Sequence, residues 1–230
     1  MGAEDINIRI RALIDSAVHS IGKEDFENAI EDLKAAEVLD KDNPEVIYNL
    51  GISHSRQGLH KTAVTYYWKL MDLPFEFVEL RNVKKMLSYS LILGESYEEA
   101  LSVLAQILRI TPMDATSNGL CGYCYEKLGR LDESIASHRK VLDVEPSNIN
   151  SCNSLAFLLA RRGSDLDEAL TFARRALASN PESPAYCDTI GYVYMKRKQP
   201  ELAKKFMKQA LEKAPASLEI RSHLSELLKI

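Results

Sequence analysis

The side chains best suited to metal or redox chemistry in this sequence are its four cysteines. Cys121 and Cys124 form a CxxC pair, a spacing found in zinc sites and in thioredoxin-like redox motifs. A zinc site needs two further ligands at suitable spacing, and a redox motif needs a strand–helix–strand context; the sequence offers neither. We therefore predict that Cys121, Cys124, Cys152 and Cys187 are reduced thiols that pack in the core.

The remaining candidates for catalysis give no recognisable constellation either. The five histidines lie outside any HExxH or related motif: His19, His54, His60, His138 and His223. Paired acids such as Glu98-Glu99 and Asp167-Glu168 stand where predicted helices begin, and there they complement the helix dipole. No glycine-rich phosphate loop follows a strand. The sequence therefore predicts no catalytic residues, no metal ligands and no cofactor, and hence a protein that is not an enzyme.

Three series of residues recur along the chain with one common period. The first is a large residue followed by a small one: Leu50-Gly51, Leu87-Ser88, Cys121-Gly122, Leu155-Ala156, Ile190-Gly191 and Leu224-Ser225. The second is a single small residue, spaced by 34, 37, 34, 35 and 34 residues: Ala29, Ala63, Ala100, Ser134, Ala169 and Ala203. The third is a proline: Pro112, Pro146, Pro181 and Pro215. Their agreement predicts stacked supersecondary units.

Each of these residue types has a physical role in stacked helix pairs. Small residues at fixed points let two helix backbones approach closely, so that ridges pack into grooves. A proline cannot continue a helix and turns the chain toward the next unit. Gly58, Gly129 and Gly163 suit the left-handed position that follows a helix end. The pattern therefore predicts an all-α protein of six helix pairs and a final single helix.

The pattern resembles the tetratricopeptide repeat (TPR) family, most clearly between Cys187 and Pro215. There Ile190, Gly191, Tyr194, Ala203, Ala210 and Pro215 take the positions of the family signature. The resemblance implies a right-handed α-solenoid, which we expect to form a single domain over residues 1–230. The expected repeats cover about 5–41, 44–75, 79–112, 114–146, 147–181 and 183–215, with a C-terminal capping helix over 217–229.

In that family the first helices of successive repeats line a concave groove that binds peptides or helices. Transferring this geometry predicts twelve groove residues: Tyr48, Ile52, Lys85, Tyr89, Tyr123, Lys127, Asn150, Asn153, Phe157, Arg161, Asp188 and Tyr192. Four of them form an expected aromatic ladder, and aromatic anchors are typical of binding hot spots. The alternative is that several of these rings pack between helices. The Lys–Asn–Arg clamp with which one TPR subgroup binds chaperone tails is absent.

The resemblance implies a non-enzymatic scaffold or adaptor with a protein or peptide partner. The alternative is a self-associating structural factor of a bacterial envelope, pilus or secretion complex. Trp68, Phe75 and Phe77 stand outside the repeat pattern, and they either pack locally around a three-residue insertion or form a self-association edge. We expect a monomer or a weak homo-oligomer.

Composition narrows the choice of partners. Among the 230 residues the net charge is −4, with −7 over residues 1–115 and +3 over residues 116–230. This charge is too small to indicate a nucleic-acid partner, and the basic run Lys196-Arg197-Lys198 lacks interleaved aromatic residues. No apolar run approaches the roughly 18 residues of a membrane span. We expect a cytoplasmic protein, or a periplasmic or membrane-anchored one if a leader has been removed.

Overall fold

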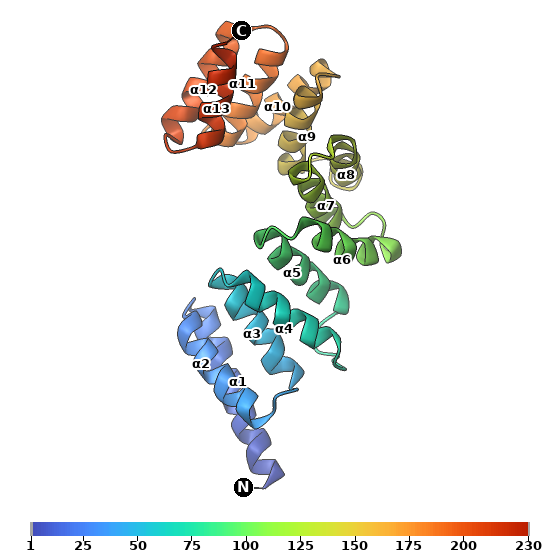
Figure 1. Cartoon of the computed structure of the whole chain (residues 1–230), viewed down its shortest axis with the longest axis vertical. Helices are drawn as coiled ribbons and strands as arrows, with labels where there is room; N and C mark the ends of the chain where they lie inside the picture. Colours follow the sequence, from blue (N-terminus) through green and yellow to red (C-terminus); the bar gives the residue numbers. More distant parts are fainter. Residues whose placement is uncertain (1, 230) are drawn as a thin grey trace. The chain divides into compact units, whose positions relative to one another are not determined.

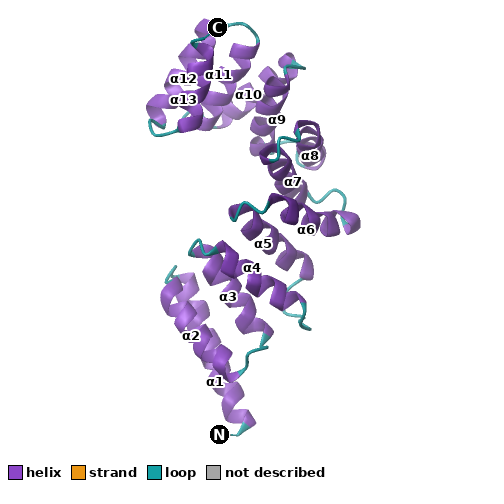
Figure 2. Ribbon diagram, viewed as in Figure 1, coloured by secondary structure: helices purple, strands orange, loops and turns teal. Residues whose placement is uncertain are grey.

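Thirteen α-helices account for most of residues 2–229, the part of the chain that this computed structural model describes, and no strand occurs there (Figures 1 and 2). They form six pairs and one single helix. The pairs are α1 (Ala3–Gly22) with α2 (Phe26–Leu39), α3 (Pro44–Arg56) with α4 (His60–Met71), α5 (Leu80–Leu93) with α6 (Tyr97–Ile110), α7 (Ala115–Lys127) with α8 (Leu131–Val144), α9 (Ile149–Arg162) with α10 (Leu166–Ser179) and α11 (Pro184–Lys196) with α12 (Pro200–Lys213); α13 (Leu218–Leu227) is single. The predicted all-α solenoid of six helix pairs and a cap is confirmed.

The helices gather into two compact units, which are described separately. Unit 1 spans Met1–Ile110 and contains α1 to α6, and unit 2 spans Thr111–Ile230 and contains α7 to α13. Within unit 2, the capping helix α13 packs against both helices of the last pair, α11 and α12, as the red end of the ribbon in Figure 1 shows. That the whole chain forms one domain stays a prediction.

The turn inside every helix pair contains at least one residue in the left-handed region, and the α9–α10 turn contains two, Gly163 and Asp165. Gly58, Gly129 and Gly163 have φ values between 74° and 79°, so the prediction for these three glycines is confirmed. The other three turns use Glu24, Glu95 and Lys198, with φ of 58° to 61°. A non-glycine residue pays a steric penalty in this region, so these turns keep their geometry because the packed helices on either side impose it.

Most first helices of the pairs also begin in the same way. A side-chain oxygen of the residue before the helix accepts a hydrogen bond from a backbone N–H of the first turn; this residue is Asn43, Asp114, Asn148 or Ser183, and Ser217 does the same for α13. Such a cap satisfies a donor that the helix leaves unpaired, and it stabilises a helix by about 1 kcal/mol. The caps fix where each first helix starts and therefore which of its faces meets the next repeat.

Close approach between the two helices of a pair depends on the small residue of the large–small motif. A Cβ on Gly51 would lie 2.6 Å from Cε1 of Tyr67, and a Cβ on Gly191 would lie 2.8 Å from Cγ of Met207. Both partner side chains are buried in the second helix of the pair. The repeating motif therefore works as a socket, in which the missing side chain of the first helix makes room for a large one from the second.

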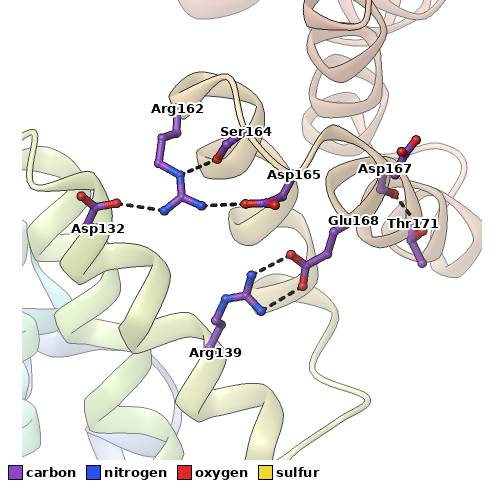
Figure 3. A network of polar contacts seen from close by, with 8 residues as sticks. All are labelled: Asp132, Arg139, Arg162, Ser164, Asp165, Asp167, Glu168 and Thr171. Atoms are coloured by element: carbon purple, nitrogen blue, oxygen red, sulfur yellow. Dashed lines mark hydrogen bonds and ion pairs between the residues drawn. The ribbon is translucent and has the colours of Figure 1, made fainter.

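Charged side chains link neighbouring repeats across the surface of unit 2 (Figure 3). Arg139 of α8 donates two hydrogen bonds to the Glu168 carboxylate of α10, at 2.9 and 2.6 Å. Arg162, the last residue of α9, bridges Asp132 of the preceding repeat and Asp165 of its own, at 2.9 Å each. The two arginines therefore tie the second helices α8 and α10 and the turn between α9 and α10 together.

The acids at helix starts have two partners at once. Asp167 and Glu168 lie in the first turn of α10, where they complement the helix dipole as predicted. Each also pairs with an arginine of an adjacent repeat, Asp167 with Arg197 and Glu168 with Arg139. The sequence showed the first role and gave no sign of the second, because inter-repeat pairs depend on how the repeats stack.

We expect the double substitution Arg139→Ala/Arg162→Ala to lower the free energy of unfolding of unit 2 by about 1 kcal/mol at low salt, because exposed pairs contribute at most about 1 kcal/mol each. The loss should shrink at about 1 M salt, where charges are screened within a few ångströms. Urea denaturation followed by circular dichroism measures it, with the exposed Arg174→Ala as the matched control. A loss that salt leaves unchanged would point to packing of the arginine stems instead.

Candidate functional site

The predicted groove residues of unit 2 lie on its first helices, and they differ in accessibility. Tyr123 on α7 is 41% exposed, Phe157 on α9 is half-buried, and Tyr192 on α11 is only 6% exposed. The rings of Phe157 and Tyr192 are in contact, with centroids 5.1 Å apart. The repeats thus bring these aromatic residues to one face, but only the α7 and α9 members are open to a partner.

The capping helix accounts for the burial at the α11 end. The ring of His223 on α13 packs at a tilt against the ring of Tyr192, with centroids 4.7 Å apart, and against that of Phe157 at 5.6 Å. Its Nδ1 lies 2.7 Å from Oδ2 of Asp188, which is 6% exposed. Two predicted groove residues, Asp188 and Tyr192, therefore form the contact between α13 and the repeats. The cap covers part of the face that the sequence placed in an open groove.

The charge of His223 is stabilised at this contact. Burial disfavours the imidazolium form, but the hydrogen bond and negative charge of Asp188, together with the carboxylates of Glu219 and Glu226, outweigh it and raise the pKa of His223. Sequence reasoning missed this residue because it carries no motif. The available signal was the polar set Glu219, Ser222, His223 and Glu226, whose helical spacing puts all four on one face of α13.

Lysine side chains cover the edges of the same face. Nζ of Lys127 lies 5.2 Å from the ring centroid of Tyr123, and Nζ of Lys196 lies 4.9 Å from that of Tyr192. Lys196 also pairs with Glu226 of α13 at 2.8 Å. Arg161, near the end of α9, is exposed. Cations above aromatic faces are stabilised by the ring quadrupole, so these contacts hold the rim of the face in place.

Two adjoining hollows open on this face between α7, α9, α11 and α13. The first, of about 270 Å³, is lined by Glu126, Asn153, Ser154, Phe157, Pro184, Ala185, Asp188, Thr189, Ala214, Ser217, Glu219 and Ile220. The second is lined by Glu126, Lys127, Phe157, Arg161, Tyr192, Glu219, Ser222, His223 and Glu226. Glu126, Phe157 and Glu219 belong to both. Six of the twelve predicted groove residues line one hollow or the other.

The polar groups around the first hollow are incompletely satisfied. Burial, and to a smaller extent the charge of Glu219 across the hollow, raise the pKa of Glu126, although Lys127 and Arg161 act in the opposite direction. The side-chain oxygen of Asn153 and Oδ1 of Asp188 are buried and accept no hydrogen bond from the described residues. Buried acceptors without a donor are costly, so this wall favours a ligand that donates hydrogen bonds.

Asn150, predicted together with Asn153 as a contact for a peptide backbone, already has a partner. Its Oδ1 accepts a hydrogen bond from the Tyr186 hydroxyl of the next repeat at 3.1 Å. The side chain of Asn150 therefore connects α9 to α11, and its role as a peptide contact stays a prediction.

The predicted groove residues of unit 1 lie on α3 and α5. Tyr48 packs edge-on against Phe77 at 5.4 Å, and Phe77 contacts Phe75 at 5.8 Å. Ile52 and Lys85 are half-buried, and Tyr89 is 52% exposed. The residues of the insertion thus pack on a groove position, yet Phe77 itself keeps 49% of its surface exposed. A ladder running from Tyr89 to unit 2 stays a prediction.

The cysteines belong to the core, as predicted, and two of the histidines lie there with them. All four thiols are buried and reduced, and burial raises the pKa of Cys121 to about 11. His138 is buried in α8, and burial lowers its pKa to about 4; it fills the space beside Gly122, where a Cβ would lie 2.5 Å from its Nε2. His54 stacks on Tyr66 at 5.4 Å. These groups are inert packing elements.

Among residues 2–229, no three His, Cys, Asp or Glu side chains come together in a way that could hold a metal ion. None of the helices described combines the length and the apolar character needed to cross a bilayer.

Family models match three segments of the chain. The model described as "TPR repeat" matches residues 23–58, and the model described as "Tetratricopeptide repeat" matches residues 115–148 and 184–217. The last two segments coincide with the pairs α7–α8 and α11–α12. The first segment covers α2 and α3, the second helix of one pair and the first helix of the next.

Curated relatives share part of their length with this chain. The TPR repeat-containing protein MJ1428 of Methanocaldococcus jannaschii is 27% identical over 154 residues, which is 64% of this chain and 27% of that protein. DnaJ homolog subfamily C member 3 of Rattus norvegicus is 28% identical over 142 residues, 56% of this chain and 28% of that protein. The chain thus spans about a quarter of the length of these relatives.

Solved structures share the fold at low sequence identity. MamA (residues 41 to the end) from Desulfovibrio magneticus RS-1 matches with a TM-score of 0.64 and 23% identity, over 75% of this chain and 97% of that one. Cut9 in its complex with Hcn1 matches with a TM-score of 0.73 and 14% identity, over 94% of this chain and 42% of that one. YrrB, titled "a TPR protein with an unusual peptide-binding site", matches with a TM-score of 0.62 and 17% identity, over 84% of this chain and 97% of that one.

Proposed function

Since the chain belongs to the tetratricopeptide repeat family, we propose that it is a non-enzymatic scaffold that binds a segment of another protein on the α7–α9–α11–α13 face of unit 2. The observation that carries this proposal is the pair of adjoining hollows on that face, with Phe157 between them and exposed Tyr123 on the same first-helix surface. An aromatic anchor beside polar, partly unsatisfied walls has the composition of a binding hot spot.

The neighbouring structures support the same proposal. YrrB is described as having a peptide-binding site, and Cut9 is described in a complex with another protein, Hcn1. Both are built from the same kind of repeat as this chain. Repeat proteins commonly use the extended surface made by their first helices for binding, and in unit 2 that surface contains the hollows.

The test uses two side chains that are exposed on this face, Tyr123 and Arg161. We expect Tyr123→Ala/Arg161→Ala to retain full helicity and to lose the proteins that the wild-type chain captures from a lysate of its source. The partner identified should then bind the variant at least about tenfold more weakly in solution, since hot-spot truncations cost about 2 kcal/mol or more. Val144→Ala, at an exposed apolar position on the second helix α8, is the matched control.

Identical capture by the wild type and the double variant would remove this face as the binding surface. A second candidate function, structural self-association, is favoured by one observation in unit 1: Leu59, Phe77 and Leu80 are each between 46% and 49% exposed. Sedimentation velocity over a wide concentration range distinguishes the two. A rise in sedimentation coefficient with concentration, together with an empty capture list, would favour self-association.

A further inference from the structure

The first hollow of unit 2 has a one-sided charge. Three carboxylates line it, those of Glu126 on α7, Asp188 on α11 and Glu219 on α13, and no lysine, arginine or histidine does. This occurs in the half of the chain whose net charge is +3, so the acidic character is local to the hollow. Two of the three acids also stand on different sides of it, one on the first helix of unit 2 and one on its last.

Two acceptor oxygens on the walls of the hollow have no hydrogen-bond donor among the described residues. Asp188 is 6% exposed; its Oδ2 accepts from His223, while its Oδ1 is buried and has no partner among the described residues. The buried side-chain oxygen of Asn153 likewise has no hydrogen-bond partner among the described residues. A buried acceptor without a donor loses its hydration energy uncompensated. These two oxygens therefore favour a ligand group that is rich in N–H donors.

The apolar part of the hollow selects among such groups. Phe157 lines it together with Pro184, Ala185, Ala214 and Ile220. A long aliphatic stem ending in a charged donor can lie along such side chains while its head reaches the carboxylates, and a cation near the Phe157 ring is stabilised further. No three potential metal ligands converge in residues 2–229, so an organic cation fits this site better than a metal ion.

We propose that the hollow between Glu126 and Glu219 is a specificity pocket for a lysine or arginine side chain of the bound protein segment. This inference rests on the proposed function, since the side chain belongs to the segment that occupies the same face. The cationic head lies between the two carboxylates and relieves their mutual repulsion, and its stem packs on Phe157. Lys127 and Arg161, which line the second hollow, then contact a different part of the segment.

The test selects random peptides displayed on phage with the full chain as bait. We expect the enriched peptides to share a lysine or arginine at one fixed position of a common motif. The best peptide, made synthetically, should bind Glu126→Gln/Glu219→Gln about tenfold or more weakly, since a hydrogen bond to a charged group contributes about 1.5–3 kcal/mol. Replacing its basic residue with norleucine should cost a similar factor for the wild type and little for the variant.

Controls separate the pocket from general electrostatics and from misfolding. Glu212→Gln removes an exposed acid of the second helix α12 and should bind like the wild type; circular dichroism verifies that every variant folds. Enriched motifs without a fixed basic residue would overturn the pocket. So would equal affinity of the peptide for the wild type and for Glu126→Gln/Glu219→Gln. If those peptides no longer bind Tyr123→Ala/Arg161→Ala, the proposed function stands and only the pocket is overturned. Failure to enrich any peptide overturns both.

Discussion

Replacing Gly51 with alanine should lower the free energy of unfolding of unit 1 by about 2 kcal/mol. The added Cβ would lie 2.6 Å from Cε1 of Tyr67 and 3.0 Å from two further ring atoms. Tyr67 is 1% exposed, so its ring cannot swing into solvent, and α3 and α4 must move apart. Alanine is a better helix former than glycine by up to about 1 kcal/mol, which offsets only part of the overpacking cost.

The single tryptophan of the chain makes this loss measurable in unit 1. Trp68 follows Tyr67 on α4 and is half-buried, so its fluorescence should report the separation of α4 from α3 during urea unfolding. The matched control is Gly22→Ala at the last position of α1, where nothing lies within 4 Å of the added Cβ. We expect a change within about 0.5 kcal/mol there. Equal midpoints for the two variants would show that the socket at Gly51 is more adaptable than its geometry indicates.

The fold was predictable because its constraints are local and repeated. A residue such as Gly191 is demanded by close helix approach, and the prolines and turn glycines recur at the same period. Each repeat therefore shows the same signal again, and six weak signals add to a strong one. The three turns at Glu24, Glu95 and Lys198 have no glycine at the left-handed position, yet the period alone was sufficient to place them.

The site was less predictable because its properties depend on contacts between repeats. The family resemblance placed Asn153, Phe157 and Arg161 on the correct helices, and the structure brings them to the two hollows. It gave no indication that α13 would cover Asp188 and Tyr192. That depends on how far the cap folds back over the first-helix face, which the spacing of residues within a repeat does not encode.

The cap consequently has two roles that share the same residues. Its apolar side, with Ile220 and Leu227 buried, closes the end of the repeat stack. Its polar side supplies Glu219 to both hollows, and His223 and Glu226 to the second. A change that loosens α13 therefore alters the candidate binding face as well as the stability of unit 2, and the contact between Asp188 and His223 joins the two roles.

His223→Gln should open α13 locally, at a cost of about 3 kcal/mol to its docking, because removing one partner of a buried ion pair leaves the other charge uncompensated. The two side chains of the pair are 12% and 8% exposed. The same contact makes the wild type sensitive to pH. Since the pKa of His223 is raised in the folded protein, its contribution is complete below the unfolded value of about 6.5 and is lost as the pH rises through the folded value.

Hydrogen–deuterium exchange of α13, expressed as protection factors that correct for the intrinsic effect of pH, tests both parts of this expectation. In the wild type the protection of α13 should fall as the pH rises above about 6.5, while that of α9 and α10 changes little. In His223→Gln it should be low throughout and independent of pH. His19→Gln, at an exposed position of α1 in unit 1, should behave as the wild type. Protection in the wild type that rises with pH would mean that His223 docks as the neutral imidazole, and the ion pair would then not be what holds the cap on the binding face.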